Sequence, residues 1–153
     1  MKMKLTSRAF SEGEKIPERF SRQGGSTSPP LAWTQIPTNA KSLALIVDDP
    51  DAPSGVFVHW LVYGISPDTT KFDEGAPPRG VHQGTNGFGD IGYGGPEPPS
   101  GTHRYFFHLY ALDREIDLAS GASLEDLDQA MRGHVIEEAI LMGHFGQRTQ
   151  AAR

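Results

Sequence analysis

The stretch VFVHWLVYGI, residues 56–65, is the clearest guide to the fold, because its β-branched and aromatic residues favour a strand. Side chains alternate along a strand, so His59 and Trp60 are expected on opposite faces. The His59 face would also carry three further side chains: Phe57, Leu61 and Tyr63. A histidine inside so apolar a strand is usually structural, and a binding role for it needs support from other segments.

Two other segments predict strands that could pair with this one. SLALIVD, residues 42–48, is a short continuous apolar run suited to burial on both faces. HRYFFHLYAL, residues 103–112, alternates, so His103 and Tyr105 share one face and Arg104 lies on the other. The residues before position 20 add an edge strand and a turn.

Helical patterns occur only near the end of the chain. Ser123 is followed three residues later by Asp126, the pattern of an N-terminal capping box, so LEDLDQAM should form a helix. Gly133 would interrupt it. The next segment, HVIEEAILMG, predicts a second helix with one apolar stripe, which contains five residues: Val135, Ile136, Ala139, Ile140 and Met142.

The order of these elements, strands first and helices last, indicates a mainly β fold with antiparallel sheets and short C-terminal helices. The 18 glycines and 12 prolines are spread along the chain, which favours short strands and shaped loops over a helix bundle. At 153 residues, of which 37% are hydrophobic, residues 1–153 fit a single domain with a core of its own.

Composition also excludes several classes of function. The net charge is −5 and no cluster of Lys or Arg offsets it, which argues against nucleic-acid binding. The absence of cysteine excludes disulfides, thiolate nucleophiles and cysteine metal sites. No stretch approaches the roughly 18 apolar residues of a membrane span, so stable membrane insertion is not expected. The N-terminus lacks the apolar region of a secretion signal, and we expect a cytoplasmic protein.

The segment between the second and third strands, residues 75–101, is the least regular part of the chain. It contains nine glycines and five prolines, and so long a loop in a compact domain is usually functional or disordered. Phe88, Ile91 and Tyr93 could anchor it, which favours a functional loop. Its GFGDIG motif, residues 87–92, matches a dinucleotide-binding pattern only in letters, because no strand precedes it and no helix follows.

A second loop, DDPDAPSG at residues 48–55, places acidic residues at alternate positions and so hints at a calcium site. The twelfth position counted from Asp49 is Trp60, not the bidentate glutamate of an EF-hand. The alternative is a turn in which prolines fix the backbone and aspartates cap N–H groups. The turn is the simpler interpretation of this segment by itself.

Taken together, these segments suggest a ligand site. Side chains that could bind an anion occur at strand ends beside Gly- or Pro-rich loops, where binding sites are common: Asp49, Asp51, His59, His103 and Tyr105. The aspartates could orient the imidazoles, and a protonated imidazole donates charge-assisted hydrogen bonds to an anion. Gly94 and Gly95 would let backbone N–H groups approach the ligand.

Several of these motifs also resemble a known family. The strings DPDAP, HWLV, SPPLAW, FGDIGYGGP, the run PPSGTHRYFF and the ending GHVIEEAILMGHFG are similar to the phosphatidylethanolamine-binding protein family. The resemblance is greatest to its bacterial and archaeal Raf-kinase-inhibitor-like branch, and it covers nearly the whole chain. It implies a sandwich of two antiparallel sheets with a small surface pocket for phosphate or phosphoryl head groups.

The resemblance also implies which residues form that pocket. Carried over by position they are Asp49, Asp51, Pro53, His59, Pro98, Pro99, His103 and Tyr105, with Gly94 and Gly95 in a loop of variable length. Because no nucleophile–base pair is evident, we expect a protein that is not an enzyme, with no catalytic residue, metal or cofactor. A regulated protein partner and a homodimer are further expectations that the resemblance raises.

Two other functions compete with anion binding. A serine-protease inhibitor would need residues 75–101 to lie extended in a protease cleft. A metal-dependent hydrolase could use Asp49, His59 and His103 as a two-histidine, one-carboxylate ligand set. A serine hydrolase has no support, because the chain contains no G-x-S-x-G motif.

Overall fold

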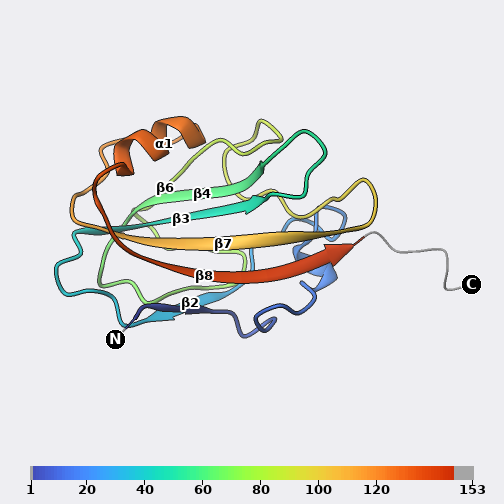
Figure 1. Ribbon diagram of the computed structural model, residues 1–153, viewed down its shortest axis with the longest axis horizontal. Coiled ribbons are helices and arrows are strands. Elements are labelled where there is room, and N and C mark those ends of the chain that lie inside the picture. The colour runs from blue at the N-terminus through green and yellow to red at the C-terminus, as the bar shows by residue number, and fades with distance from the viewer. Residues whose placement is uncertain (1, 147–153) are drawn as a thin grey trace, which may run out of the picture.

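The computed structural model describes residues 2–146 as a sandwich of two antiparallel sheets with one α-helix (Figure 1). The larger sheet has the strand order β6-β4-β3-β7-β8, and the smaller one has the order β1-β2-β5. The elements of the larger sheet are β3 (Ser42–Asp49), β4 (Phe57–Ile65), β6 (His82–Gln83), β7 (Thr102–Leu112) and β8 (Val135–Gly146). The others are β1 (Lys4–Thr6), β2 (Leu31–Thr34), β5 (Lys71–Phe72), a short 3-10 helix at Glu18–Phe20 and α1 (Leu124–Met131). The mainly β antiparallel fold and the three long strands predicted from the sequence are confirmed.

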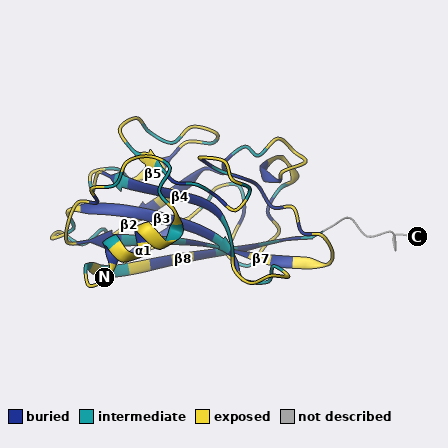
Figure 2. Cartoon of the chain, turned by 90° about the horizontal axis from the view of Figure 1, so that it is seen from above, coloured by how far each residue is buried: buried dark blue, intermediate teal, exposed yellow. Residues whose placement is uncertain are grey.

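The main core lies between the two sheets, where dark blue strands fill the interior in Figure 2. Trp33 of β2 and Trp60 of β4 both pack against Phe72 of β5, so aromatic rings from both sheets meet. Fully burying one large apolar side chain contributes about 1.5–3 kcal/mol, so the many buried side chains of this layer stabilise the sandwich. A second cluster lies on the outer face of the larger sheet, where α1 covers Leu61 and Tyr63.

The first predicted helix is confirmed together with its cap. The Ser123 side chain accepts a hydrogen bond from the Asp126 N–H, and the Asp126 side chain accepts one from the Ser123 N–H. The helix ends at Met131, and Gly133 follows with a φ of +81°, a conformation that glycine adopts without strain.

The second predicted helix is wrong, because this segment forms β8. It pairs with β7 along almost its whole length, and β7·β8 is the most extensive strand contact in the sheet. Apolar residues also recur at every second position of this segment, and Ala139, Leu141 and Phe145 are buried on the inner face. Ile140, assigned to the apolar stripe of a helix, is 48% exposed. The hydrogen bonds and side-chain packing offered by β7 therefore override the helical pattern.

A β-bulge in β4 changes which side chains lie on each face of this strand, so the alternation expected from the sequence is wrong around His59. Val47 of β3 pairs with Trp60 and Asp48 pairs with Val58, so His59 is an extra residue with no partner across the ladder. The bulge turns the His59 ring inward, 5.1 Å from the ring of Tyr105 on β7, on the same side as Trp60. The residues expected to share its face, Leu61 and Tyr63, lie in the outer cluster.

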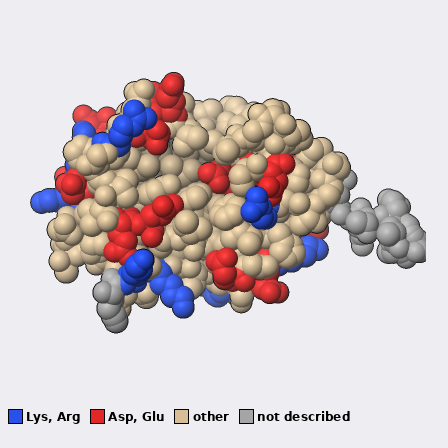
Figure 3. Space-filling model, in the orientation of Figure 1, with Lys and Arg blue, Asp and Glu red and all other residues tan. Residues whose placement is uncertain are grey.

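None of the helices within residues 2–146 is long and apolar enough to cross a membrane. On the face shown in Figure 3, acidic and basic side chains are interspersed and no continuous basic area occurs.

Candidate functional site

Four of the predicted residues converge at the end of the sandwich where β3 ends and β7 begins. Asp49, His59, His103 and Tyr105 are all buried on the inner face, with exposed fractions of 3%, 3%, 8% and 1%. Because β3 and β7 are adjacent and antiparallel, the last residue of one lies beside the first residues of the other (Figure 1). Positions 54 residues apart in sequence therefore meet.

Asp49 holds the imidazole of His103. The Asp49 Oδ2 atom lies 2.6 Å from His103 Nδ1, and both side chains are nearly inaccessible. The other carboxylate oxygen, Oδ1, accepts a hydrogen bond from the backbone N–H of Asp51 at 2.8 Å. A carboxylate can only accept, so Nδ1 of His103 carries the proton and Nε2 is left for another partner.

His59 is held by the loop that precedes β7. Its Nδ1 atom lies 2.7 Å from the carbonyl oxygen of Gly94, so Nδ1 donates this hydrogen bond. Burial lowers the pKa of His59 below its usual value, although hydrogen bonding to Gly94 and the charge of Asp49 act in the opposite direction. The neutral ring therefore has an unprotonated Nε2 that can accept a hydrogen bond.

Tyr105 has a buried polar atom without a partner. Its hydroxyl makes no hydrogen bond to any described residue, although the side chain lies between the two imidazoles, with centroids 5.1 Å from His59 and 6.5 Å from His103. Burial and the nearby charge of Asp49 raise its pKa, so the hydroxyl stays protonated and can donate. An unsatisfied buried hydroxyl costs about 1–3 kcal/mol, and such groups in a native fold need an explanation.

Asp51 and Pro53 lie outside this buried group. The Asp51 carboxylate accepts hydrogen bonds from the backbone and the guanidinium of Arg104, at 2.8–2.9 Å, and contacts neither imidazole. Arg104 lowers the pKa of Asp51 to about 2. Pro53 is exposed in the β3–β4 turn. Asp51 therefore fixes this turn against β7, as the turn interpretation expected of the acidic loop.

Gly94 and Gly95 contact the site in a different way from the one expected. The Gly94 N–H donates to the His59 carbonyl at 2.9 Å, and the Gly95 N–H donates to Ser26 Oγ at 3.0 Å, so both are engaged within the chain. Glycine is required here by close packing. A Cβ atom at residue 94 would lie 2.5 Å from the Phe88 ring, and one at residue 95 would lie 2.4 Å from the Phe20 carbonyl oxygen.

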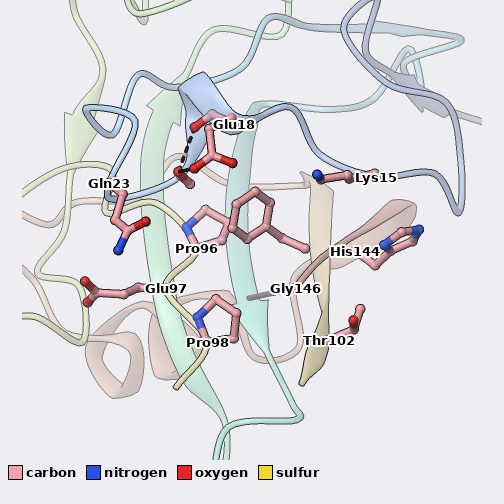
Figure 4. A pocket seen from close by; sticks show the side chains of 11 residues that line it. Lys15, Glu18, Gln23, Pro96, Glu97, Pro98, Thr102, His144 and Gly146 are labelled. Carbon is pink, nitrogen blue, oxygen red and sulfur yellow. Dashed lines mark hydrogen bonds between the residues drawn. The ribbon is translucent and has the colours of Figure 1, made fainter. Parts of the chain in front are cut away.

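Pro98 and Pro99 lie in different environments. Pro98 is buried and lines a cavity of about 930 Å³ beside the site, whereas Pro99 is exposed. Figure 4 shows Lys15 and His144 on another side of this cavity, which also contains the carboxylates of Glu18 and Glu97. Asp49, His59, His103 and Tyr105 do not line it. Its mixed charges give no preference for an anion.

Two aromatic residues beside His59 were missed as part of the site. The rings of Phe57 and Phe88 lie 4.9 and 5.8 Å from the His59 ring and 4.8 Å from each other, which makes an aromatic cover over the imidazole. The sequence placed Phe57 beside His59 and named Phe88 as an anchor of its loop. Their proximity depends on the fold of residues 84–94, which no local pattern indicates.

The geometry does not favour the two competing functions. Residues 75–101 fold back on the larger sheet: β6 pairs with β4, and Thr85 pairs with Ile91. This loop is therefore not extended as protease inhibition would require. Among residues 2–146, no group of three His, Asp or Glu side chains is arranged to hold a metal ion, because Nδ1 of His59 faces a carbonyl and Asp49 faces His103.

Comparisons with known proteins agree with this architecture. The model of the phosphatidylethanolamine-binding protein family matches residues 6–146. A UPF0098 protein of Methanothermobacter thermautotrophicus is 53% identical over 148 residues, which cover 94% of this chain and 98% of that protein. A Chlamydia trachomatis protein described as a homologue of phosphatidylethanolamine-binding protein has a crystal structure with a TM-score of 0.91 at 45% identity, over 96% of this chain and 99% of that one.

YbcL of Escherichia coli, described as a member of the mammalian family, has a TM-score of 0.90 at 30% identity and covers 97% of this chain and 100% of its own. The family match, the identity to relatives and the shared fold all cover nearly the whole chain. This chain belongs to the phosphatidylethanolamine-binding protein family.

Proposed function

We propose that this chain is a binding protein rather than an enzyme, with a small pocket for phosphate, a phosphoryl group or a similar anionic head group. The observation that carries this proposal is the buried Tyr105 hydroxyl, which belongs to a ring near both imidazoles and has no hydrogen-bond partner among the described residues, while burial raises its pKa. A ligand oxygen that accepts from it would remove the cost of this unpaired donor.

The other groups in the pocket complement an oxyanion. Asp49 leaves Nε2 of His103 as a donor when the ring is protonated, and the carboxylate then balances the imidazolium charge. Nε2 of neutral His59 accepts a hydrogen bond, for example from the P–OH of a singly charged phosphoryl group. The proposed pocket thus offers two donors and one acceptor, which suits a singly charged phosphoryl group that still carries a proton.

Binding rather than catalysis is favoured by how the imidazoles are engaged. Nδ1 of His59 is bonded to a carbonyl and Nδ1 of His103 to a carboxylate, and among residues 2–146 neither ring is hydrogen-bonded to a serine or threonine hydroxyl that it could activate. A regulated protein partner and a homodimer stay predictions of the family resemblance, and a cytoplasmic location stays a prediction from the N-terminal sequence.

An NMR titration tests the pocket directly. The wild type and a His59→Ala variant are titrated with inorganic phosphate, O-phosphoethanolamine and, as a control without the anion, ethanolamine. We expect saturable shifts for the two phosphorylated probes, centred on Asp49, His59 and His103, and their loss in the variant. His134→Ala, which removes a partly exposed imidazole paired with Asp113, is the matched control and should bind as the wild type does. Equal phosphate binding by the His59→Ala variant would refute the proposed site.

A further inference from the structure

The charges of the buried site do not by themselves suit a doubly charged anion. Asp49 contributes one carboxylate to the buried group, Asp51 adds a second just outside it, and the guanidinium of Arg104 is already bonded to Asp51. Within the site, a charge on the ring of His103 would be balanced by Asp49, whose Oδ2 atom lies 2.6 Å from Nδ1. A phosphate dianion would therefore be repelled unless a further cation lies at the edge of the pocket.

Arg22 carries a cation that contacts the aromatic cover of His59. Its guanidinium lies 3.7 Å from the centre of the Phe88 ring, and Phe88 is one of the two aromatic residues that cover His59. The stacking orders the guanidinium through a cation–π interaction without using its N–H groups. Those N–H groups can still bind an anion in a bidentate manner.

The hydrogen bonds of Arg22 contrast with those of Arg19, three residues earlier. Arg19 also stacks on a ring, that of Phe20, but it donates two hydrogen bonds to Glu74 at 2.8 and 3.1 Å. The carboxylate that faces Arg22, that of Glu97, is 3.8 Å away, too far for a hydrogen bond. Arg22 thus has an ion pair without a hydrogen bond, whereas the ion pair of Arg19 has two.

The backbone around Arg22 is fixed to the loop that holds His59. The Arg22 N–H donates to the carbonyl of Pro96 at 3.0 Å, and the hydroxyl of Tyr93 donates to the carbonyl of Phe20 at 2.7 Å. The Gly95 N–H donates to Ser26 on the other side of Arg22. The position of Arg22 relative to Gly94, which orients His59, is therefore set by the fold.

From these contacts we infer that Arg22 determines the charge selectivity of the pocket, by binding the doubly charged form of a phosphoryl ligand at its edge in competition with Glu97. This inference rests on the proposed function and adds to it the residue that selects dianions. It also assigns Glu97 an inhibitory role, because its carboxylate competes with the ligand for the same guanidinium.

Three variants test this inference, because they are expected to weaken, strengthen or leave unchanged the binding of a phosphorylated ligand. The dissociation constant for O-phosphoethanolamine is measured by NMR at pH 7.5 and two salt concentrations. Loss of one charge-assisted contact should weaken binding by the Arg22→Gln variant about tenfold and flatten its salt dependence. Glu97→Gln should strengthen binding a few-fold, since it removes the competing carboxylate. Arg19→Gln, the matched control, should bind as the wild type does.

The outcomes separate this inference from the proposed function. If the wild type binds, the His59→Ala variant does not and the Arg22→Gln variant binds with unchanged affinity, the inference is wrong and the proposed pocket stands. If Glu97→Gln weakens binding as Arg22→Gln does, the pair has only a structural role and the inference is again wrong. A wild type that binds neither phosphorylated probe contradicts both.

Discussion

The Nδ1 atom of His103 lies 2.6 Å from the Oδ2 atom of Asp49, and both side chains are buried between the two sheets. The preceding residue, Asp48, contacts His108 on the outer face of the same two strands. Two consecutive aspartates at the end of β3 therefore each contact a histidine of β7, one on each face of the sheet. The inner contact, Asp49 with His103, belongs to the candidate pocket. The outer contact, Asp48 with His108, links the two strands.

Removal of Asp49 should strongly destabilise the fold. Asp49→Ala leaves the imidazole of His103 buried without its acceptor, and breaking a buried pair in this way costs about 3–5 kcal/mol in the free energy of unfolding. Urea denaturation at pH 7 measures the loss. Asp51→Ala is the control, because its pair with Arg104 is partly exposed, and it should cost much less. Equal decreases in the free energy of unfolding for the two variants would show that the buried pair stabilises the fold no more than the exposed one does.

Tyr105→Phe should stabilise the free protein while it weakens ligand binding. The variant removes a buried hydroxyl that has no partner, so the free energy of unfolding should rise by about 1 kcal/mol. The comparison is Tyr93→Phe, which deletes a hydroxyl bonded to the Phe20 carbonyl and should destabilise by about the same amount. Thermal and urea unfolding measure whether each variant raises or lowers the free energy of unfolding. A destabilised Tyr105→Phe protein would argue against an unpaired hydroxyl.

Stability should depend on pH through His108. Burial lowers its pKa, but hydrogen bonds to Asp48 and Glu138 outweigh this, so the folded-state pKa is raised above its usual value. A raised folded-state pKa gives stabilisation that is fully present below the unfolded-state pKa, about 6.5, and is lost as pH rises through the folded-state value. The difference in unfolding free energy between wild type and His108→Gln should thus be larger at pH 5.5 than at pH 9. A difference independent of pH would contradict this.

His59 should titrate in the opposite direction. Its folded-state pKa is lowered by burial, so its contribution to stability is retained above about pH 6.5 and decreases as pH falls below that value. NMR of the imidazole Cε1–H signals measures each histidine separately. We expect the midpoint of His59 below that of His108, and a midpoint of His59 at or above the usual histidine value would overturn its assignment as a buried neutral ring.

Gly95→Ala should destabilise the loop that carries the site. The added Cβ would lie 2.4 Å from the Phe20 carbonyl oxygen and 2.6 Å from the Ser21 carbonyl carbon, which are backbone atoms that cannot move independently. Such overpacking costs about 1–3 kcal/mol. Ser100→Ala, an exposed change in the same loop, should leave the free energy of unfolding unchanged. Circular dichroism during urea unfolding compares the two.

Local sequence patterns predicted elements whose signals are confined to neighbouring residues. The strands β3, β4 and β7 followed from apolar runs and alternation, and α1 followed from the reciprocal cap of Ser123 and Asp126. Asp49 and His103 were both placed at strand ends, where an aspartate could orient an imidazole, and their side chains are in contact. Such predictions succeed because propensity, alternation and capping act within a few residues.

Other features could not be predicted locally, and β8 shows why. Its residues contain a helical stripe and a strand alternation at once, and only the adjacent edge of β7 selects the strand. The bulge at His59 likewise arises from the register between β3 and β4. Because neither the partner strand nor the register is present in the segment itself, no local pattern contains this information.

The sequence by itself thus determined the fold class and the main strands, and it predicted the residue types of the proposed anion pocket. The tertiary structure alone decided which of these residues share a space. It brought Asp49, His59, His103 and Tyr105 together, directed Asp51 to Arg104 and placed Arg22 on Phe88. The physical reason is that these contacts depend on strand register, a bulge and loop closure, which are set by long-range packing and not by neighbouring residues.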